Sequence, residues 1–562
     1  MIILKNFLIF CFLIVFQISS FSQNTQSQNS NTTKNLTQSN DQDVIEKFQK
    51  GFSSILSNKG IKNSKFGLAV YSLDKSQYYF RKNSDMLLTP ASTTKLFTSF
   101  GALIGLGDDF QIRTTVQANA KPENGILNSD IYLVGRGDPV LSTNDIEVLA
   151  DQIQNSGIKE IRGNVYADIS FFDGISDRQI YSGDRDRVQN IPPITVLNID
   201  ANTVTVLVTA GSKPGSAVNV QIIPPSDVYT KIINAKVSGA RTEAVQPKKS
   251  KLKVSSKKII PIKNKHKKFK KHVSVDYQNE DYLNRYGDSP SKKKRAKRQK
   301  IKSTIAISQK ADASGKISFI ISGSLAPNRS YSSSFQIKRP ELVAAGVLKN
   351  RLMSGGVKIK GDVAVKKNID TAKAMTIAEF ARPIRDLLFR VNKHSDNYMA
   401  EQVFKIVGAS SGNKSDNAEG ARSLIFSTLQ KHEINCEDCE LNDGSGLSRR
   451  NKVTPEIMVS LLKVFYQSPH FKDFDTTLSI AGIDGTLQRR MQGTSAFRNL
   501  HGKTGTLANV SALAGFVSSK DNEKFAFSFI FNGPNIHFYK NLENELASYI
   551  AEFTSKLKTN DN

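Results

Sequence analysis

Apolar side chains recur at helical spacing in two segments near the ends of the chain. From Val44 to Leu56 apolar residues stand three or four positions apart, and Leu542 to Phe553 repeats the pattern. This spacing predicts a helix in each segment. Between them, Lys65–Lys82 contains two apolar runs around a polar turn at Asp74 and Lys75, which predicts a β-hairpin.

Three further strands are predicted near the carboxyl end, at residues 501–507, 510–517 and 524–531. In the last one, phenylalanine occupies every second position from Phe525 to Phe531, which is the period of a strand with one face more buried. The polar turn at 520–523 makes the last two strands an antiparallel hairpin. The simplest assembly is one antiparallel sheet, made from both ends of the chain and covered by both terminal helices.

The middle of the chain has a different pattern. Residues 105–370 contain many short β-type runs separated by turn signals, for example at 130–134, 204–208 and 317–321. We therefore expect an α+β fold. Residues 44–104 and 371–562 would form a main domain with the antiparallel sheet flanked by helices, and residues 105–370 would form β-rich inserted domains.

Residues 1–22 have the pattern of an export signal. Lys5 precedes an apolar run from Phe7 to Phe16, and Ser20-Phe21-Ser22 offers a cleavage site. A transmembrane helix needs about 20 apolar residues, so a cleaved signal peptide is favoured over an uncleaved anchor. Residues 23–43 are rich in Ser, Asn, Gln and Thr and predict a flexible leader. We expect an exported protein of the periplasm or cell envelope.

The composition is that of a globular protein. Of 562 residues, 39% are hydrophobic and 23% charged, which excludes a mostly disordered chain and a collagen-like one. The net charge is +27, and residues 248–302 carry 21 Lys and Arg against four acidic residues. This basic segment is either a solvated, disordered loop or an electrostatic tether to anionic envelope polymers or lipid headgroups. Because the chain carries an export signal, no nucleic-acid partner is expected.

Two cysteines, Cys436 and Cys439, remain after removal of residues 1–22. A C-x-x-C pair can be a redox motif or half of a zinc site. The acidic surroundings do not resemble a redox helix start, and only His432 is a nearby further ligand. A structural disulfide is the favoured interpretation, and we expect neither a metal nor a cofactor.

The first chemical motif is S-x-x-K at Ser92-Thr93-Thr94-Lys95. Pro90 suits a helix start, and residues three apart share a helix face, so Ser92 Oγ and Lys95 Nζ can meet. That is the geometry of a serine nucleophile activated by an amine. The lysine must be neutral to accept a proton, which burial and a second cation would favour by lowering its pKa. The same spacing occurs elsewhere, as in Ser460–Lys463, but there in the middle of a predicted helix.

The second motif, K-T-G, occurs once, at Lys503-Thr504-Gly505 on the first closing strand. Lys503 can bind a substrate carboxylate, and the side chains of Thr504 and Thr506 can orient it. Gly505 would leave room for a substrate along the strand. The backbone N–H groups of Ser92 and Thr506 could form an oxyanion hole.

The third motif, S-D-N, occurs twice, at residues 395–397 and 415–417. The first copy lies between two apolar helical segments and the second follows a flexible-looking stretch, so we choose Ser395 and Asn397. Ser395 would relay a proton between Lys95 and the leaving amine, and Asn397 would hydrogen-bond the substrate backbone. S-x-x-K, S-x-N and K-T-G together define a serine acyl-transfer site.

Other motifs favour structural roles. Residues 408–412 match G-x-S-x-G, but a helical pattern precedes them where that motif needs a strand. His394 and His501 are triad candidates only because they adjoin motifs. The R-G-D string at 136–138 and the stretch Asp443–Gly446 are predicted to be turns.

The chain resembles the D-alanyl-D-alanine carboxypeptidase/endopeptidase family of penicillin-binding proteins, in the type with a long insertion between its first two motifs. The segments that carry the resemblance are Pro90–Lys95, Gly135–Ser142, His394–Glu401, Asp443–Ser448, Gly482–Met491 and His501–Thr506. The resemblance implies a penicillin-binding-protein/serine β-lactamase-like fold. It also implies attack by Ser92 on the D-Ala-D-Ala bond of a peptidoglycan stem peptide, often cleavage of cross-links, and β-lactams as inhibitors.

Two alternatives stay open. A β-lactamase on the same fold would turn over penicillin, although the long insertion and the lack of an E-x-x-L-N segment between Asn397 and Lys503 count against it. A catalytically silent protein could instead bind cell-wall polymers through the basic segment, which departs from the family pattern. A silent relative has no chemical need for intact Ser92, Lys95, Ser395 and Lys503.

Overall fold

The computed structural model describes residues 42–57, 59–107, 109–185, 188–238, 303–369 and 374–555. The predicted signal peptide, nearly all of the predicted leader and the basic segment 248–302 lie outside these ranges, so they stay predictions. Within the described ranges, no helix is both long enough and apolar enough to cross a membrane.

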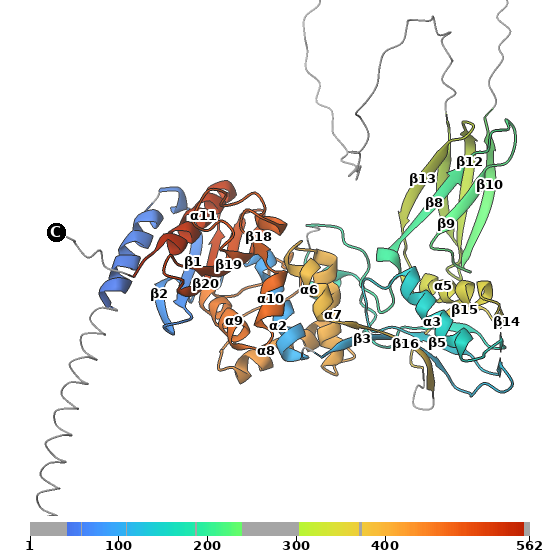
Figure 1. Ribbon diagram of the computed structural model, residues 1–562, viewed down its shortest axis with the longest axis horizontal. Coiled ribbons are helices and arrows are strands. Elements are labelled where there is room, and N and C mark those ends of the chain that lie inside the picture. The colour runs from blue at the N-terminus through green and yellow to red at the C-terminus, as the bar shows by residue number, and fades with distance from the viewer. Residues whose placement is uncertain are drawn as a thin grey trace, which may run out of the picture.

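Both ends of the described chain contribute to one six-stranded antiparallel sheet (Figure 1). Its strands, in spatial order, are β17 (Ser479–Ile480), β18 (His501–Leu507), β19 (Val510–Ser518), β20 (Lys524–Asn532), β1 (Lys65–Ser72) and β2 (Gln77–Lys82). β1 lies beside β20 because the two strands pair along their whole length, from Lys65 opposite Asn532 to Ser72 opposite Phe525. The predicted sheet from both chain ends is confirmed.

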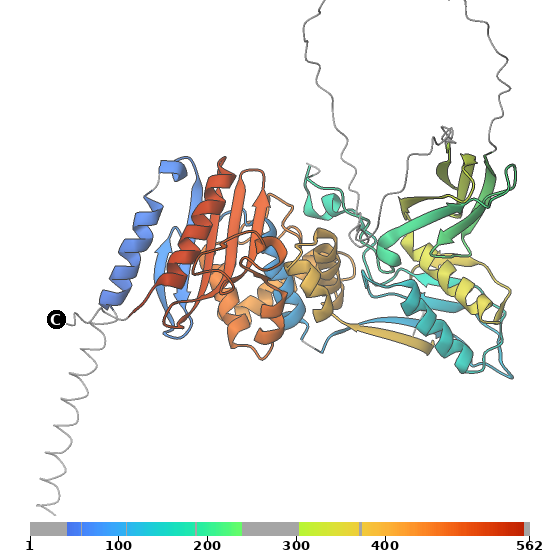
Figure 2. The same cartoon turned by 45° about the horizontal axis from the view of Figure 1, so that its top comes forward.

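The terminal helices cover one face of this sheet, as predicted. The helix of residues 42–56 and α11 (Ile536–Glu552) lie side by side on it (Figures 1 and 2), and the Tyr549 ring of α11 packs 5.4 Å from that of Phe48. The alternating phenylalanines of β20 point into this interface and are fully buried with Phe48 and Phe52. The aromatic side chains therefore hold the two ends of the chain together.

The other face of β20 is buried as well, which the alternation did not predict. Ala526, Ser528 and Ile530 are covered by a helical layer whose nearest member is α9 (Pro455–Gln467). Small side chains at 526 and 528 let that helix approach the strand. The remaining helices of this layer are α2 (Lys95–Phe100), α6 (Arg385–Asn392), α7 (Asn397–Ser410), α8 (Asn417–Lys431) and α10 (Phe471–Thr477).

Between α2 and α6 the described chain forms four smaller sheets. Their strands are β15 (Val363–Lys366), β7 (Val165–Asp168), β5 (Ile131–Val134), β3 (Gln111–Ala118) and β16 (Met375–Pro383) in one; β14 (Lys358–Ile359), β6 (Glu160–Ile161) and β4 (Ile126–Leu127); β10 (Tyr229–Val237), β12 (Ile317–Leu325) and β11 (Ala306–Ala311); and β13 (Ser330–Gln336), β8 (Thr203–Thr209) and β9 (Asn219–Ile223). The helices are α3 (Thr143–Asn155), α4 (Arg178–Ser182) and α5 (Pro340–Ser354). Below, "the insertion" means residues 105–383. It extends past the predicted boundary at 370, because β16 pairs with β3.

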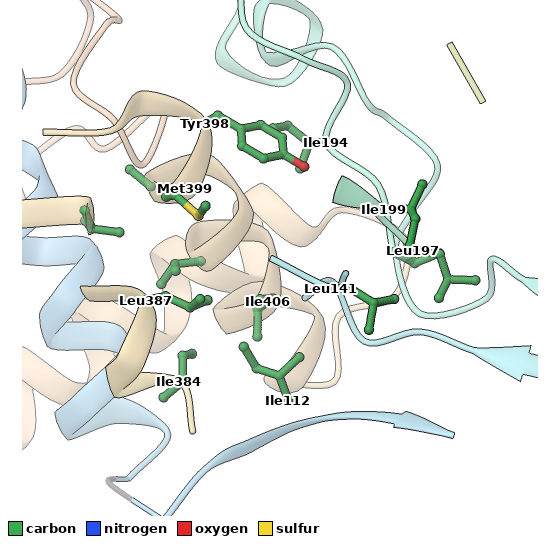
Figure 3. Packing of buried hydrophobic residues seen from close by; sticks show 14 of the residues in the cluster. Ile112, Leu141, Ile194, Leu197, Ile199, Ile384, Leu387, Tyr398, Met399 and Ile406 are labelled. Carbon is green, nitrogen blue, oxygen red and sulfur yellow. The ribbon is translucent and has the colours of Figure 1, made fainter. Parts of the chain in front are cut away.

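The insertion packs directly on α6 and α7 (Figure 3). Ile384, Leu387, Met399 and Ile406 belong to one buried cluster with apolar residues of the insertion. Among the insertion residues of this cluster, Figure 3 labels Ile112, Leu141, Ile194, Leu197 and Ile199. A polar contact adds to it, because the Tyr398 hydroxyl donates to Asn198 Oδ1 at 2.7 Å. The insertion and the helical layer therefore share one core.

Cys436 and Cys439 are joined by a disulfide in the turn that follows α8. Both side chains are buried in the core, and the N–H of Cys439 donates to the carbonyl of Cys436 at 3.0 Å. The structure thus agrees with the favoured interpretation of this pair as a structural disulfide.

Candidate active site

Ser92 lies in a tight turn that leads into α2. Ala91–Thr94 form a 3₁₀ turn and the α-helix begins at Lys95, so the helix starts slightly later than its spacing predicted. In a 3₁₀ turn residues three apart eclipse each other. The Lys95 Nζ atom therefore lies 3.1 Å from Ser92 Oγ.

Lys95 is completely buried, and its Nζ atom contacts three oxygens. Besides Ser92 Oγ these are Asn397 Oδ1 at 2.7 Å and the carbonyl oxygen of Ser445 at 2.5 Å. Burial lowers the pKa of Lys95 from its usual 10.5 to about 8, although the negative charges of Asp443, Glu401 and Asp396 oppose the change. A sizeable fraction of Lys95 is therefore neutral at mildly alkaline pH.

The chosen S-D-N copy lies in the sharp connection between α6 and α7. Ser395 has a positive φ of 54°, and Asp396 caps α7 by accepting a hydrogen bond from the N–H of Met399 at 3.1 Å. The cap makes Asn397 the first residue of the helix. Asn397 can thus accept from Lys95 with Oδ1 while its amide nitrogen donates to Gln189 of the insertion.

The K-T-G motif lies on β18 beside these residues. Lys503 is buried, and its Nζ atom donates to Ser395 Oγ at 2.9 Å and to the carbonyl of Thr504 at 2.9 Å. Burial, assisted by the positive charge of Lys95, holds the pKa of Lys503 well below its usual range. Thr504 Oγ1 donates to Thr486 Oγ1 at 2.8 Å, and Thr506 is exposed.

Gly505 allows β18 to approach the serine turn. A Cβ atom at this position would lie 2.5 Å from the carbonyl oxygen of Pro90 and 3.2 Å from the Cβ atom of Ala91. Real Cβ atoms do not come that close to a backbone oxygen. Glycine is therefore required for the two motifs to meet, and room for a substrate along the strand stays a prediction.

A second set of residues supports Lys95, and sequence reasoning missed its role. The predicted turn at Asp443–Gly446 is present, but its Ser445 carbonyl contacts Lys95. Glu401, buried on α7, accepts the N–H groups of Gly444 and Ser445 at 3.1 and 2.9 Å. One signal was available: Glu401 stands four residues after Asn397 on a mostly apolar helix, so both share one face.

The remaining candidates lie apart from these contacts. Asp416 of the second S-D-N copy caps α8. Residues 408–412 form the end of α7 and the turn after it, and a helix, not a strand, leads to their serine. His501 lies 2.8 Å from Asp475, and exposed His394 packs its ring on Phe389. The S-x-x-K pair Ser460–Lys463 lies within α9.

Ser92, Lys95, Ser395, Asn397 and Lys503 therefore meet in one place, although three distant segments supply them. The family model described as the D-Ala-D-Ala carboxypeptidase 3 (S13) family matches residues 48–286 and 288–553. The chain belongs to this family. Membership confirms the family predicted from the motifs and the predicted enzyme class, a serine-type D-Ala-D-Ala carboxypeptidase.

Similar proteins agree with the S13 assignment. The chain is 26% identical over 513 residues to the D-alanyl-D-alanine carboxypeptidase DacB of Haemophilus influenzae, covering 88% of this chain and 94% of that one. It is 26% identical over 525 residues to the D-alanyl-D-alanine carboxypeptidase of Actinomadura sp., covering 91% and 85%. The crystal structure of H. influenzae penicillin-binding protein 4 aligns with a TM-score of 0.59 at 23% identity, over 89% and 99% of the chains. The predicted fold class is confirmed.

Proposed function

We propose that this S13 enzyme releases the terminal D-alanine from peptidoglycan stem peptides, and cleaves cross-links between stems, through an acyl-enzyme on Ser92. One observation carries the proposal: two buried lysines each contact a serine, Lys95 with Ser92 at 3.1 Å and Lys503 with Ser395 at 2.9 Å. Each amine thereby lies within proton-transfer distance of a hydroxyl.

The contacts of Lys95 support proton transfer from Ser92 to its amine. Neutral Lys95 has two N–H bonds and one lone pair. The Asn397 amide oxygen and the Ser445 carbonyl can only accept hydrogen bonds. When both N–H bonds go to these oxygens, the lone pair faces Ser92 Oγ, as a general base requires.

In the proposed reaction Ser92 Oγ attacks the carbonyl carbon of the D-Ala-D-Ala bond while Lys95 takes the hydroxyl proton. The backbone N–H groups of Ser92 and Thr506 would hold the developing oxyanion. The C–N bond then breaks, and the leaving amine receives the proton through Ser395. Water hydrolyses the ester with Lys95 again as base, which restores free Ser92.

Lys503 would recognise the free carboxylate of the substrate. Its depressed pKa reflects a buried cation beside another cation, and an incoming carboxylate supplies the missing counter-charge. Thr504, Thr506 and Thr486 line the same strand edge and can donate hydroxyl hydrogen bonds to it. Asn397 would hydrogen-bond the substrate backbone.

The test is to incubate the purified protein with penicillin and to record intact and peptide mass spectra. We expect a lasting single adduct on the peptide that contains Ser92. Ser92→Ala should abolish it, whereas Ser460→Ala, the matched serine of another S-x-x-K sequence, should keep it. D-Alanine release from a peptide ending in D-Ala-D-Ala, and cleavage of cross-linked muropeptides, should follow the same pattern.

Other outcomes would favour the alternatives. Rapid penicillin hydrolysis without a lasting adduct would favour the β-lactamase. No adduct and no turnover in a folded protein would favour the silent polymer-binding protein. One crystal structure of H. influenzae penicillin-binding protein 4 is a complex with a β-lactam, which supports β-lactams as inhibitors here.

Acylation should also depend on pH in one direction. Lys95 must be neutral, and its pKa is about 8, so the acylation rate constant should rise with pH with a midpoint near that value. A stopped-flow pH series with a fluorescent penicillin measures this midpoint. A rate that is flat from pH 6 to about 9 would contradict Lys95 as the base.

Export and the basic segment remain sequence-based parts of the proposal. We propose cleavage after Ser22 and a location in the periplasm or cell envelope, which amino-terminal sequencing of protein from that fraction tests. Contact of residues 248–302 with anionic polymers or lipid rests on their charge alone. Binding to vesicles of anionic lipid, compared with a chain lacking 248–302, tests that contact.

A further inference from the structure

Helix α4 of the insertion contacts the residues that support Lys95. The Tyr181 hydroxyl donates to Glu401 Oε2 at 2.8 Å. Glu401 in turn accepts the N–H groups of Gly444 and Ser445, and the Ser445 carbonyl accepts from Lys95 Nζ. These hydrogen bonds, joined through the backbone of Ser445, connect the insertion to the amine beside Ser92.

Arg178, three residues before Tyr181, makes a second connection from the same helix. Its guanidinium donates to Asp443 Oδ2 at 3.0 Å, and both side chains are essentially inaccessible to solvent. The Asp443 carboxylate also accepts the N–H groups of Gly446 at 2.9 Å and Ser448 at 2.8 Å. Arg178 and Tyr181 therefore bind the two carboxylates that hold the 443–446 turn.

These carboxylates need such partners. Glu401 and Asp443 are both fully buried, and burial together with the charge of Asp443 raises the pKa of Glu401 to about 7. A buried carboxylate is costly unless hydrogen-bond donors satisfy it. Tyr181 is itself held on its other side, since Lys405 Nζ lies 4.9 Å above its ring while pairing with buried Asp173 at 2.5 Å.

We propose that Tyr181 and Arg178 are positioning residues for Lys95. By anchoring Glu401 and Asp443, they keep the Ser445 carbonyl where it directs the Lys95 lone pair at Ser92. The proposal rests on the role of Lys95 proposed above and extends it, because it makes α4 of the insertion a part of the acylation machinery. The insertion would then contribute to catalysis as well as to any binding.

The test is Tyr181→Phe, which removes one hydroxyl and keeps the ring over Lys405. We expect the acylation rate constant for penicillin at Ser92 to fall about tenfold, while the dissociation constant of the complex before acylation changes less than about twofold. Tyr166→Phe is the matched control. Its hydroxyl, on β7 of the insertion, accepts a local bond from Asn164 at 3.2 Å, so the acylation rate of this variant should stay unchanged.

A second experiment compares Glu401→Gln with and without Tyr181→Phe, so that a general effect on folding can be recognised. If Tyr181 acts through Glu401, adding Tyr181→Phe to Glu401→Gln should slow acylation no further than Glu401→Gln alone. The proposal is overturned if the two substitutions reduce the acylation rate by independent factors that multiply. It is also overturned if Tyr181→Phe leaves the rate unchanged, or if Tyr166→Phe reduces it equally. The unaltered protein separates the two proposals, because an adduct on Ser92 there supports the function whatever Tyr181→Phe does.

Discussion

The two S-D-N tripeptides stand at opposite ends of α7 and make an internal comparison. In both, the aspartate caps a helix: Asp396 accepts from the N–H of Met399 and Asp416 from that of Glu419. Both asparagines also contact the insertion, Asn397 through Gln189 and Asn417 through the backbone of Asp173. The same tripeptide thus produces the same kind of helix N-cap, although only the first copy has a positive φ at its serine.

Their surroundings differ. Ser395 accepts from Lys503 and Asn397 accepts from Lys95, so both side chains face ionisable groups. Ser415 is exposed, and its hydroxyl bonds to nearby Asn413. The buried Asn417 side chain bonds to backbone. A 14-residue helix, about 20 Å long, separates the two places. Chemistry at this site depends on the neighbours that the fold supplies and not on the tripeptide.

Removing the two serine hydroxyls should give the largest difference in acylation rate. Ser395→Ala removes the proposed proton relay and a hydrogen-bond acceptor of Lys503, so the acylation rate constant should fall about 1000-fold. Ser415→Ala should leave it unchanged, because that hydroxyl is exposed and distant. Fluorescent-penicillin labelling under single-turnover conditions measures both. Equal rates in the two variants would remove Ser395 from the mechanism.

Substituting the two asparagines should affect different properties, the acylation rate for Asn397 and the stability for Asn417. Asn397→Ala removes one acceptor of Lys95, and acylation should fall about 100-fold with a small change in stability. Asn417→Ala leaves the partly buried N–H of Asp173 without its acceptor, which should cost about 2 kcal/mol of unfolding free energy with normal acylation. Labelling kinetics and urea denaturation of both variants check this. A loss of acylation in both variants, or a loss of stability in both, would contradict this prediction.

Substituting the two aspartates should give the smallest difference, a shift in the pH dependence of acylation. Each N-cap lost to alanine costs about 1 kcal/mol of stability. Only Asp396 also raises the pKa of Lys95 through its charge, so Asp396→Ala should move the rising limb of the acylation rate to lower pH. Asp416→Ala should leave the midpoint in place. The pH series proposed for the unaltered protein is repeated on both variants. An unchanged midpoint in Asp396→Ala would contradict the prediction.

Strong local patterns allowed much of the fold to be predicted. The alternating phenylalanines of β20 and the apolar stripe of α11 have only one way to bury their side chains, so the terminal sheet and its helices follow. Ser92 and Lys95 were found for the same reason, since three-residue spacing on a helical turn aligns them. The pairing of β16 with β3 was missed, because residues 257 positions apart or more join there, from Ala118 opposite Met375 to Gln111 opposite Pro383.

The support for Lys95 could not be predicted in the same way. Glu401 and Asp443 look like ordinary acids in the sequence, and Tyr181 like an ordinary aromatic. Only in the fold do they become buried partners of one another and of the turn at 443–446. Burial and hydrogen bonding among segments distant in sequence cannot be read from spacing.

The sequence by itself determined most of the terminal helices and strands and the presence of the three motifs, because helical and strand periods act over a few residues. The flanking patterns favoured the first S-D-N copy. The tertiary structure alone decided how far burial lowers the pKa of Lys95 and that α4 supports it. The hydrogen bond between Lys95 and Asn397 joins residues 302 positions apart. Such contacts form only when the whole core is assembled, since their energy depends on excluding water from all partners at once.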